Sequence, residues 1–306
     1  MTTYIMWLPV ALCAYVVLAV VSVLDKYILS NTRTKPVLFV FYSAIFVLPI
    51  GLLIPFGVSF PATPMDWIIE AVAGISFALG LWVMYIGILE SEISHIGPLI
   101  GAAIPFFVLI LSGIFLGEEL PFQKLLAVFI LIAGSLLVSF EKSKKHNGWH
   151  MGMLWGILAG LIFAVSHVAS KYAYTAYGFY GGFVWTRLWI GVIGVLLLFS
   201  PAVRKSIFPG KADKKSVAGP KKNIYFVAAN KILGVVGVVG VQYAIAIGSV
   251  TVVNALAGVQ YVFLMIIVAL MSKYTPRIFK EDYTRREIAM EIISILLIGI
   301  GLALLV

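Results

Sequence analysis

Two basic residues lie inside apolar stretches of the sequence, where a charge needs a partner. Arg187 lies several residues into the apolar run 182–199, and Lys231 lies nine residues into the run 223–247. An ionisable side chain at bilayer depth costs several kcal/mol unless it faces a partner or a water-filled cavity. No acidic residue lies at comparable depth, because Glu70, Glu90, Glu92 and Glu291 all fall near the ends of the predicted helices.

Two buried cations without a buried acid favour an anionic group on a substrate, such as a carboxylate or a phosphate. The alternative is that Arg187 snorkels or pairs with an acid in a loop and that Lys231 caps backbone carbonyls. The sequence does not decide between anion binding and these structural roles for either residue.

Amide side chains in the same part of the chain could orient a bound substrate. Gln242 follows Lys231 by eleven positions, which is close to three helical turns, so both project from one helical face. Asn254 and Gln260 lie in the next apolar run. We expect these three amides to donate and accept hydrogen bonds in a substrate site.

Aromatic side chains are candidate walls of that site: Trp82, Tyr85, Tyr243 and Tyr261. Aromatic residues near span ends also serve as interfacial anchors, which is the alternative interpretation. The same rings would suit a quaternary amine through cation–π contact. The charge of the two buried cations favours an anionic or zwitterionic substrate over such an amine.

His167 is also placed among the candidate substrate-binding residues, one helical turn before Lys171. A histidine in a membrane span can carry protons or hydrogen-bond a neighbouring helix, and the second role is the commoner one. On the same run Gly152, Gly156 and Gly160 recur at every fourth position, which predicts close helix packing.

The elements that must hold these residues follow from composition. The chain has 306 residues, of which 62% are hydrophobic and 11% charged, with a mean hydropathy of +1.07, and this excludes a water-soluble fold. A membrane-spanning helix needs roughly 20 apolar residues, and ten such runs are present: 6–24, 37–56, 67–89, 95–116, 122–140, 149–172, 182–199, 223–247, 250–271 and 288–306. We therefore predict an all-α polytopic membrane protein with ten transmembrane helices.

Charge and cysteine usage exclude other classes. The net charge of +9 comes from basic residues in the short gaps between apolar runs, where they orient membrane helices and do not indicate nucleic-acid binding. The only cysteine, Cys13, excludes an intramolecular disulfide. The sequence has no Walker A motif, HExxH motif or deep carboxylate pair, so we expect no catalytic residue, no metal site and no cofactor.

Internal similarity divides the chain into two halves. Residues 19–27 resemble residues 164–172, and residues 85–91 resemble residues 243–249 in the same order. Five helices in each half place the second half upside down relative to the first. We therefore predict two inverted five-helix repeats, residues 1–147 and 148–306.

The sequence Gly-Glu-Glu-Leu at 117–120, just after the fourth run, resembles the glycine–glutamate signature of the EamA repeat in the drug/metabolite transporter (DMT) superfamily. The second-half counterpart, residues 279–283, keeps an acid and lacks the glycine. The resemblance implies an alternating-access carrier in a family that handles amino acids, drugs, nucleotide sugars, sugar phosphates or choline. It also implies cytoplasmic termini, whereas the basic loops place both termini outside by the positive-inside rule.

These observations predict a secondary transporter, and not an enzyme, for a small polar metabolite that is anionic or zwitterionic. A carrier of a quaternary amine or drug is the first alternative; a lipid-handling membrane enzyme or a channel is the alternative from another class. The expected partners are a small-molecule substrate and the lipid bilayer, with no nucleic acid, for a monomer or homodimer in a prokaryotic plasma membrane.

Overall fold

A computed structural model of the chain describes residues 6–29, 36–90, 93–139, 151–207, 224–274 and 285–305. Every regular element in these ranges is a helix, which confirms the predicted all-α class. The elements are α1 (Trp7–Leu29), α2 (Pro36–Ile45), the 3-10 helix η1 (Leu48–Phe56), α3 (Pro64–Glu90), α4 (Ile93–Leu116), α5 (Phe122–Ser139), α6 (Met151–Leu197), α7 (Pro201–Ile207), α8 (Ile224–Ile247), α9 (Val250–Ala255), α10 (Ala257–Tyr274) and α12 (Arg285–Leu305).

Within the described ranges, six helical segments are long and apolar enough to cross a membrane: they lie in α1, α3, α4, α6, α8 and the stretch formed by α9 and α10. Three shorter apolar segments occupy residues 40–56, 122–137 and 289–305. A chain with these helices crosses the membrane several times, while the count of ten spans stays a prediction. The predicted acidic motif at 279–283 lies outside the described residues.

The second apolar run is not one continuous helix. A single span over 37–56 was expected, but α2 ends at Ile45 and the chain continues as η1. Pro49 lies in the first turn of η1 and Pro55 lies inside it. Each proline lacks a backbone donor and crowds the preceding turn, which interrupts an α-helix and favours the tighter 3-10 geometry.

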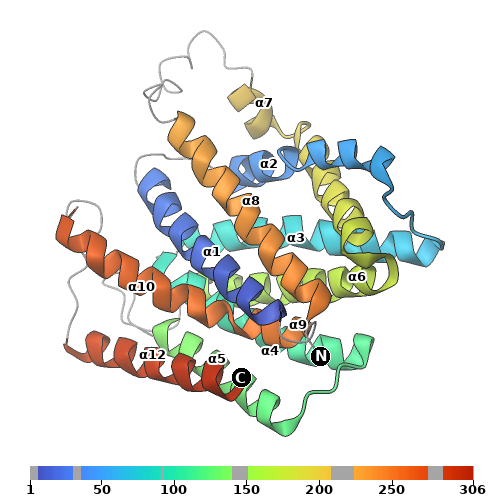
Figure 1. Ribbon diagram of the computed structural model, residues 1–306. Helices are drawn as coiled ribbons and strands as arrows, with labels where there is room; N and C mark the ends of the chain where they lie inside the picture. The colour runs from blue at the N-terminus through green and yellow to red at the C-terminus, as the bar shows by residue number, and fades with distance from the viewer. Residues whose placement is uncertain are drawn as a thin grey trace.

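The long helix α6 reverses direction at Gly178. This residue has φ 70° and ψ 167°, a conformation open to glycine because it has no Cβ. Residues nine apart in a straight helix are separated by about 13 Å, yet a Cβ at Gly182 would lie 2.8 Å from the Ala173 carbonyl carbon. α6 therefore forms two arms that fold against each other, the first arm (residues 151–177) and the second arm (residues 179–197), as the yellow-green ribbon in Figure 1 indicates.

Glycines bring α3 and α4 close to both arms. On α3, Gly80 lies against Phe163 of the first arm and Gly74 lies against Thr186 of the second arm. Gly160 of the first arm lies against Ala103 of α4. The close packing expected from the glycine repeat of the sixth run is thus confirmed, and it places α6 at the centre of the first-half helices.

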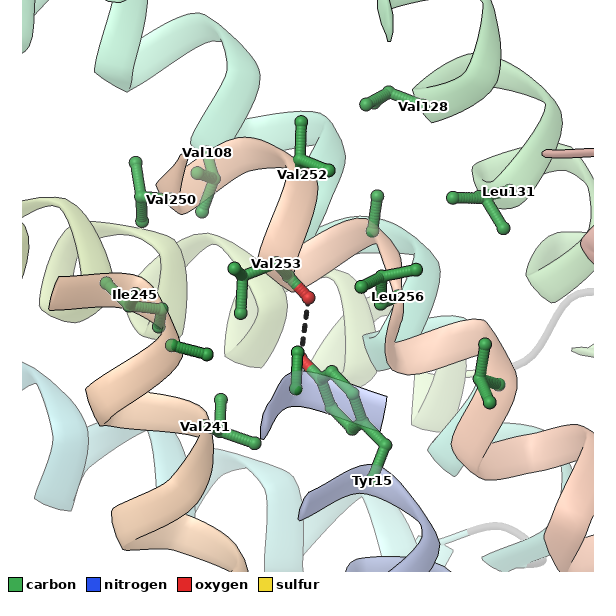
Figure 2. Packing of buried hydrophobic residues seen from close by; sticks show 14 of the residues in the cluster. Tyr15, Val108, Val128, Leu131, Val241, Ile245, Val250, Val252, Val253 and Leu256 are labelled. Carbon is green, nitrogen blue, oxygen red and sulfur yellow. Dashed lines mark hydrogen bonds between the residues drawn. The ribbon is translucent and has the colours of Figure 1, made fainter. Parts of the chain in front are cut away.

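Other helices of the first half pair with helices of the second half. Helix α1 runs beside α8, and α12 runs beside α5 (Figure 1). The predicted ninth span is divided at Leu256 between α9 and α10, where the Val259 N–H donates to the Leu256 carbonyl in a tighter three-residue turn. Figure 2 shows Tyr15 of α1 inserted beside this division, its hydroxyl donating to the Val253 carbonyl at 2.9 Å.

Candidate substrate-binding site

Arg187 lies on the second arm of α6 and is almost completely buried, with 5% of its surface exposed. Its guanidinium carbon is 4.8 Å from the centre of the Phe77 ring and 5.0 Å from the centre of the Phe183 ring. The Nε atom is buried without a hydrogen-bond partner, and no acid of the described chain forms an ion pair with this side chain. Arg187 is therefore a buried cation held between aromatic rings and not by a carboxylate.

A hydrogen-bonded pair next to Arg187 joins α6 to α8. The Tyr174 hydroxyl donates to Gln242 Oε1 at 2.8 Å, and both side chains are buried. The same hydroxyl is within hydrogen-bonding reach of the Arg187 guanidinium. Gln242 was predicted as a site residue, whereas Tyr174 was missed because the sixth apolar run was ended at Tyr172.

A second buried pair joins α6 to α9. His167 Nδ1 lies 2.6 Å from Asn254 Oδ1, and Asn254 Nδ2 donates to the Val250 carbonyl at 2.7 Å. Because the amide nitrogen is engaged with a carbonyl, the amide oxygen faces the ring and Nδ1 carries the hydrogen. Of the two roles considered for His167, the structure contains the hydrogen bond to a neighbouring helix.

Aromatic rings pack beside Tyr174 and Arg187. The Phe179 ring centre lies 5.5 Å from that of Tyr174, 5.0 Å from Phe183 and 5.1 Å from Tyr243. Tyr243 thus belongs to the aromatic group around Arg187, with 41% of its surface exposed. Phe179 and Phe183 were not among the predicted residues: Phe179 lies in the gap between the runs 149–172 and 182–199, and the sequence does not show that Phe183 faces Arg187.

Three predicted residues, Arg187, Gln242 and Tyr243, are thus linked through the neighbouring rings. The other two, His167 and Asn254, form a pair whose histidine lies two turns, or about 10 Å, before Tyr174 on the same arm of α6, and the five are treated as one group. We call this group, with Tyr174, Phe179 and Phe183, the central polar site.

The remaining predicted wall and amide residues make contacts elsewhere. Tyr261 donates to the Gly97 carbonyl at 2.5 Å and so joins α10 to α4. Gln260 donates to Ser22 Oγ at 3.2 Å and joins α10 to α1. The Tyr85 hydroxyl lies near Ser43 of α2, and Trp82 is 37% exposed on α3.

The prediction that Lys231 is buried without an acid is wrong. Its side chain is 47% exposed, and Nζ lies 3.8 Å from Asp25 Oδ1, which also accepts a 2.7 Å hydrogen bond from Asn230 Nδ2. Lys231 precedes Gln242 by eleven residues, or about 16 Å along α8. Lys231 and Gln242 are therefore too far apart along α8 for both to touch one small substrate.

Replacing Lys231 by glutamine should change little. A partly exposed ion pair contributes on the order of 0–1 kcal/mol, so we expect the melting temperature in detergent and the response to anionic compounds to match those of the unmodified protein. A scanning fluorimetry experiment measures both. If this variant no longer responded to anionic compounds, Lys231 would have to be counted as a substrate-binding residue.

The sequence also placed Glu70 near a helix end, and this is a second correction. Glu70 is the seventh residue of α3, is 1% exposed, and neither carboxyl oxygen has a hydrogen-bond partner in the structure. The premise that no acid is buried at depth is therefore wrong. Burial arises because α3 packs against both arms of α6 along this face.

Two polar links hold the junction between α8 and α9. Lys171 Nζ donates to the carbonyls of Ile245, Ala246 and Gly248 at 3.0, 3.0 and 2.8 Å, which satisfies the free carbonyls at the end of α8. Thr251 donates to Glu118 at 2.5 Å. Glu118 of the glycine–glutamate signature thus ties the end of α4 to the start of α9.

Residues 5–140 match the sequence model of the EamA-like transporter family. The match confirms the resemblance to the DMT superfamily, whose EamA members are transporters. With its apolar helices, the protein is a multi-pass membrane protein whose residues 5–140 match this transporter family.

The fold is found in solved structures. One, whose title reads only "Crystal structure of protein", is 16% identical, has a TM-score of 0.65, and the alignment covers 98% of this chain and 97% of that chain. At this identity the likeness shows the fold alone. No curated protein matches the sequence.

Proposed function

We propose that the protein is a secondary transporter that carries a small anionic or zwitterionic metabolite by alternating access, and that Arg187 binds the anionic group. The observation that carries the proposal is the buried guanidinium of Arg187, which no described acid neutralises. A buried charge without a counter-charge costs several kcal/mol. A carboxylate or phosphate on the substrate would offset that cost with charge-assisted hydrogen bonds.

The neighbours of Arg187 suit the rest of such a substrate. The Tyr174–Gln242 pair and the His167–Asn254 pair are neutral groups that can exchange hydrogen bonds with a second polar group. Because the groups in the pairs are uncharged, Arg187 sets the charge of the central polar site. Selection of an anion follows from that charge.

Alternating access would use the helices that meet at this site. In the proposed architecture of ten spans and two inverted repeats, 1–147 and 148–306, the halves rock around a fixed central site. The links at Lys171 and Glu118 hold one end of α8 and α9, and the contact of Asp25 with Asn230 holds the other end of α8. Opening one end while the other stays linked would expose the site to one side at a time.

The rival substrate, a quaternary amine, fits less well. Phe77 and Phe183 are the rings that would face a cation, and the guanidinium of Arg187 already lies over both. A second cation there would be repelled by the first. A lipid-handling membrane enzyme would need a cluster of polar residues near one interface, and the sequence offers Glu90, Glu92 and His95 as such a group. Of these, Glu90 is exposed, and the other two side chains lie outside the described residues.

A thermal-shift screen tests the proposal. The purified protein in detergent is exposed to L-glutamate, glycerol 3-phosphate, a nucleotide sugar and choline, since a ligand that prefers the folded state raises the melting temperature. We expect stabilisation by anionic or zwitterionic compounds in the unmodified protein and not in Arg187→Gln. Stabilisation by choline alone would contradict the proposal.

A further inference from the structure

The buried carboxyl group of Glu70 has no function in the site described above. It is 1% exposed, and both of its oxygens lack a hydrogen-bond partner in the structure. An unpartnered carboxylate in an apolar environment costs several kcal/mol, while the neutral acid costs far less. Glu70 therefore carries its proton in this arrangement of the helices.

Glu70 lies on the face of α3 that contacts both arms of α6. One turn further along α3, the Ala73 carbonyl accepts a 2.7 Å hydrogen bond from Ser166 of the first arm, and Gly74 lies against Thr186 of the second arm. Phe77 lies one turn beyond these residues, and the Arg187 guanidinium packs over its ring. Glu70 and Phe77 are seven residues apart, or about 10 Å along the helix.

The other side of Glu70 leads toward the start of α3. Asp66, one turn earlier on the same face, accepts hydrogen bonds from the Thr63 hydroxyl at 2.6 Å and the Tyr172 hydroxyl at 3.2 Å. The Tyr177 hydroxyl, next to the reversal of α6, accepts from the Ala62 N–H at 2.9 Å. Polar groups thus extend from the exposed segment before α3 to the turn preceding Glu70.

Few other ionisable groups face this part of α3. From α3 itself there is Asp66; from α6 there are Tyr172 and Tyr177, with Arg187 two turns deeper. The other helices packed on α3 are α2 and α4: α2 has no charged residue, and the only titratable residue of α4 is a histidine whose side chain lies outside the described part. Once it had lost its proton, Glu70 would therefore face one acid, Asp66 on its own helix, and one cation, Arg187 across the interface.

We propose that Glu70 is a proton-binding site that couples transport to proton movement, an inference that rests on the proposed function. When α3 separates from the arms of α6, water reaches the carboxyl from the Asp66 end and accepts its proton. The proton is the only group transferred, and the carboxylate that remains is attracted by Arg187. An anion bound at Arg187 removes that attraction, so anion binding favours return of the proton and the two would move in the same direction.

Infrared spectroscopy tests proton binding without any substrate. The detergent-purified protein at neutral pH should show a protonated-carboxyl C=O band that is absent in Glu70→Gln and shifted in Glu70→Asp. Glu119→Gln, which changes an exposed glutamate, is the matched control and should leave the band unchanged. A spectrum in which Glu70→Gln and the unmodified protein have the same band overturns the proposal.

Proteoliposomes test the coupling. With radiolabelled L-glutamate and glycerol 3-phosphate as probes, an inward proton gradient should raise accumulation several-fold in the unmodified protein and in Glu119→Gln. Glu70→Gln should retain exchange of the same probe and lose the response to the gradient. A response to the gradient that persists in Glu70→Gln overturns the coupling. If the unmodified protein transports neither probe while its infrared band is intact, the coupling is overturned for these anions. That second result counts against the proposed function and leaves the proton site standing.

Discussion

Arg187→Gln is expected to lower transport of an anionic substrate at least about 100-fold while the protein still folds and inserts. Each charge-assisted hydrogen bond contributes about 1.5–3 kcal/mol, and two of them from one guanidinium account for the loss, since 1.4 kcal/mol is tenfold. Glutamine keeps hydrogen-bonding capacity and removes the charge. Uptake of radiolabelled probe into proteoliposomes, normalised to inserted protein, measures the effect.

Two controls separate charge from packing in that experiment. Arg187→Lys keeps the positive charge and loses the planar fork, so we expect an intermediate loss of about tenfold. Lys231→Gln removes the cation of the partly exposed pair with Asp25 and should leave transport unchanged. Equal losses in the Arg187 and Lys231 variants would mean that net charge, and not the central polar site, governs transport.

Gly74→Ala should destabilise the protein strongly for so small a change. A Cβ at this position would collide with the Thr186 carbonyl oxygen and would lie 2.5 Å from Trp189 Cβ, and neither is the free end of a flexible side chain. Overpacking of this kind costs typically about 1–3 kcal/mol. We expect a lower melting temperature in detergent and, because α3 is pushed from the second arm, weaker binding of anionic compounds.

Gly113→Ala is the matched control for that change. Gly113 lies inside α4 and is exposed, and a Cβ added there would have no neighbour within 4 Å. Alanine is favoured over glycine in a helix by about 1 kcal/mol, so this variant should melt at the same or a higher temperature. A Gly74→Ala protein that melts at the same temperature as Gly113→Ala would show that the α3–α6 contact is looser than described.

The sequence predicted the helical class and the burial of Arg187, because apolar runs and depth within a run are local properties. The separate spans predicted over 149–172 and 182–199 require a reversal between them, and the structure places it at Gly178. Tyr174 was missed because it lies beyond the predicted end of the first of these spans, and Phe183 because the sequence does not show which aromatic rings of a span face Arg187.

Pairings between distant segments account for the two errors on charged residues. Lys231 and Asp25 belong to different halves of the chain and meet only because α1 runs beside α8. Glu70 was assigned to a helix end from its position along the chain, yet its exposure is set by how α6 covers α3. The number of residues between a side chain and the nearest loop does not predict its burial when a neighbouring helix covers that part of the chain.

Counterflow in proteoliposomes tests most directly whether this protein is a carrier with an anion site at Arg187. Vesicles loaded with unlabelled glycerol 3-phosphate or L-glutamate are diluted into a trace of the same labelled compound. The account predicts saturable uptake with one of these probes, faster than into empty vesicles and lost in Arg187→Gln. Non-saturating uptake that is equal in loaded and empty vesicles, or counterflow that persists in Arg187→Gln, would contradict it.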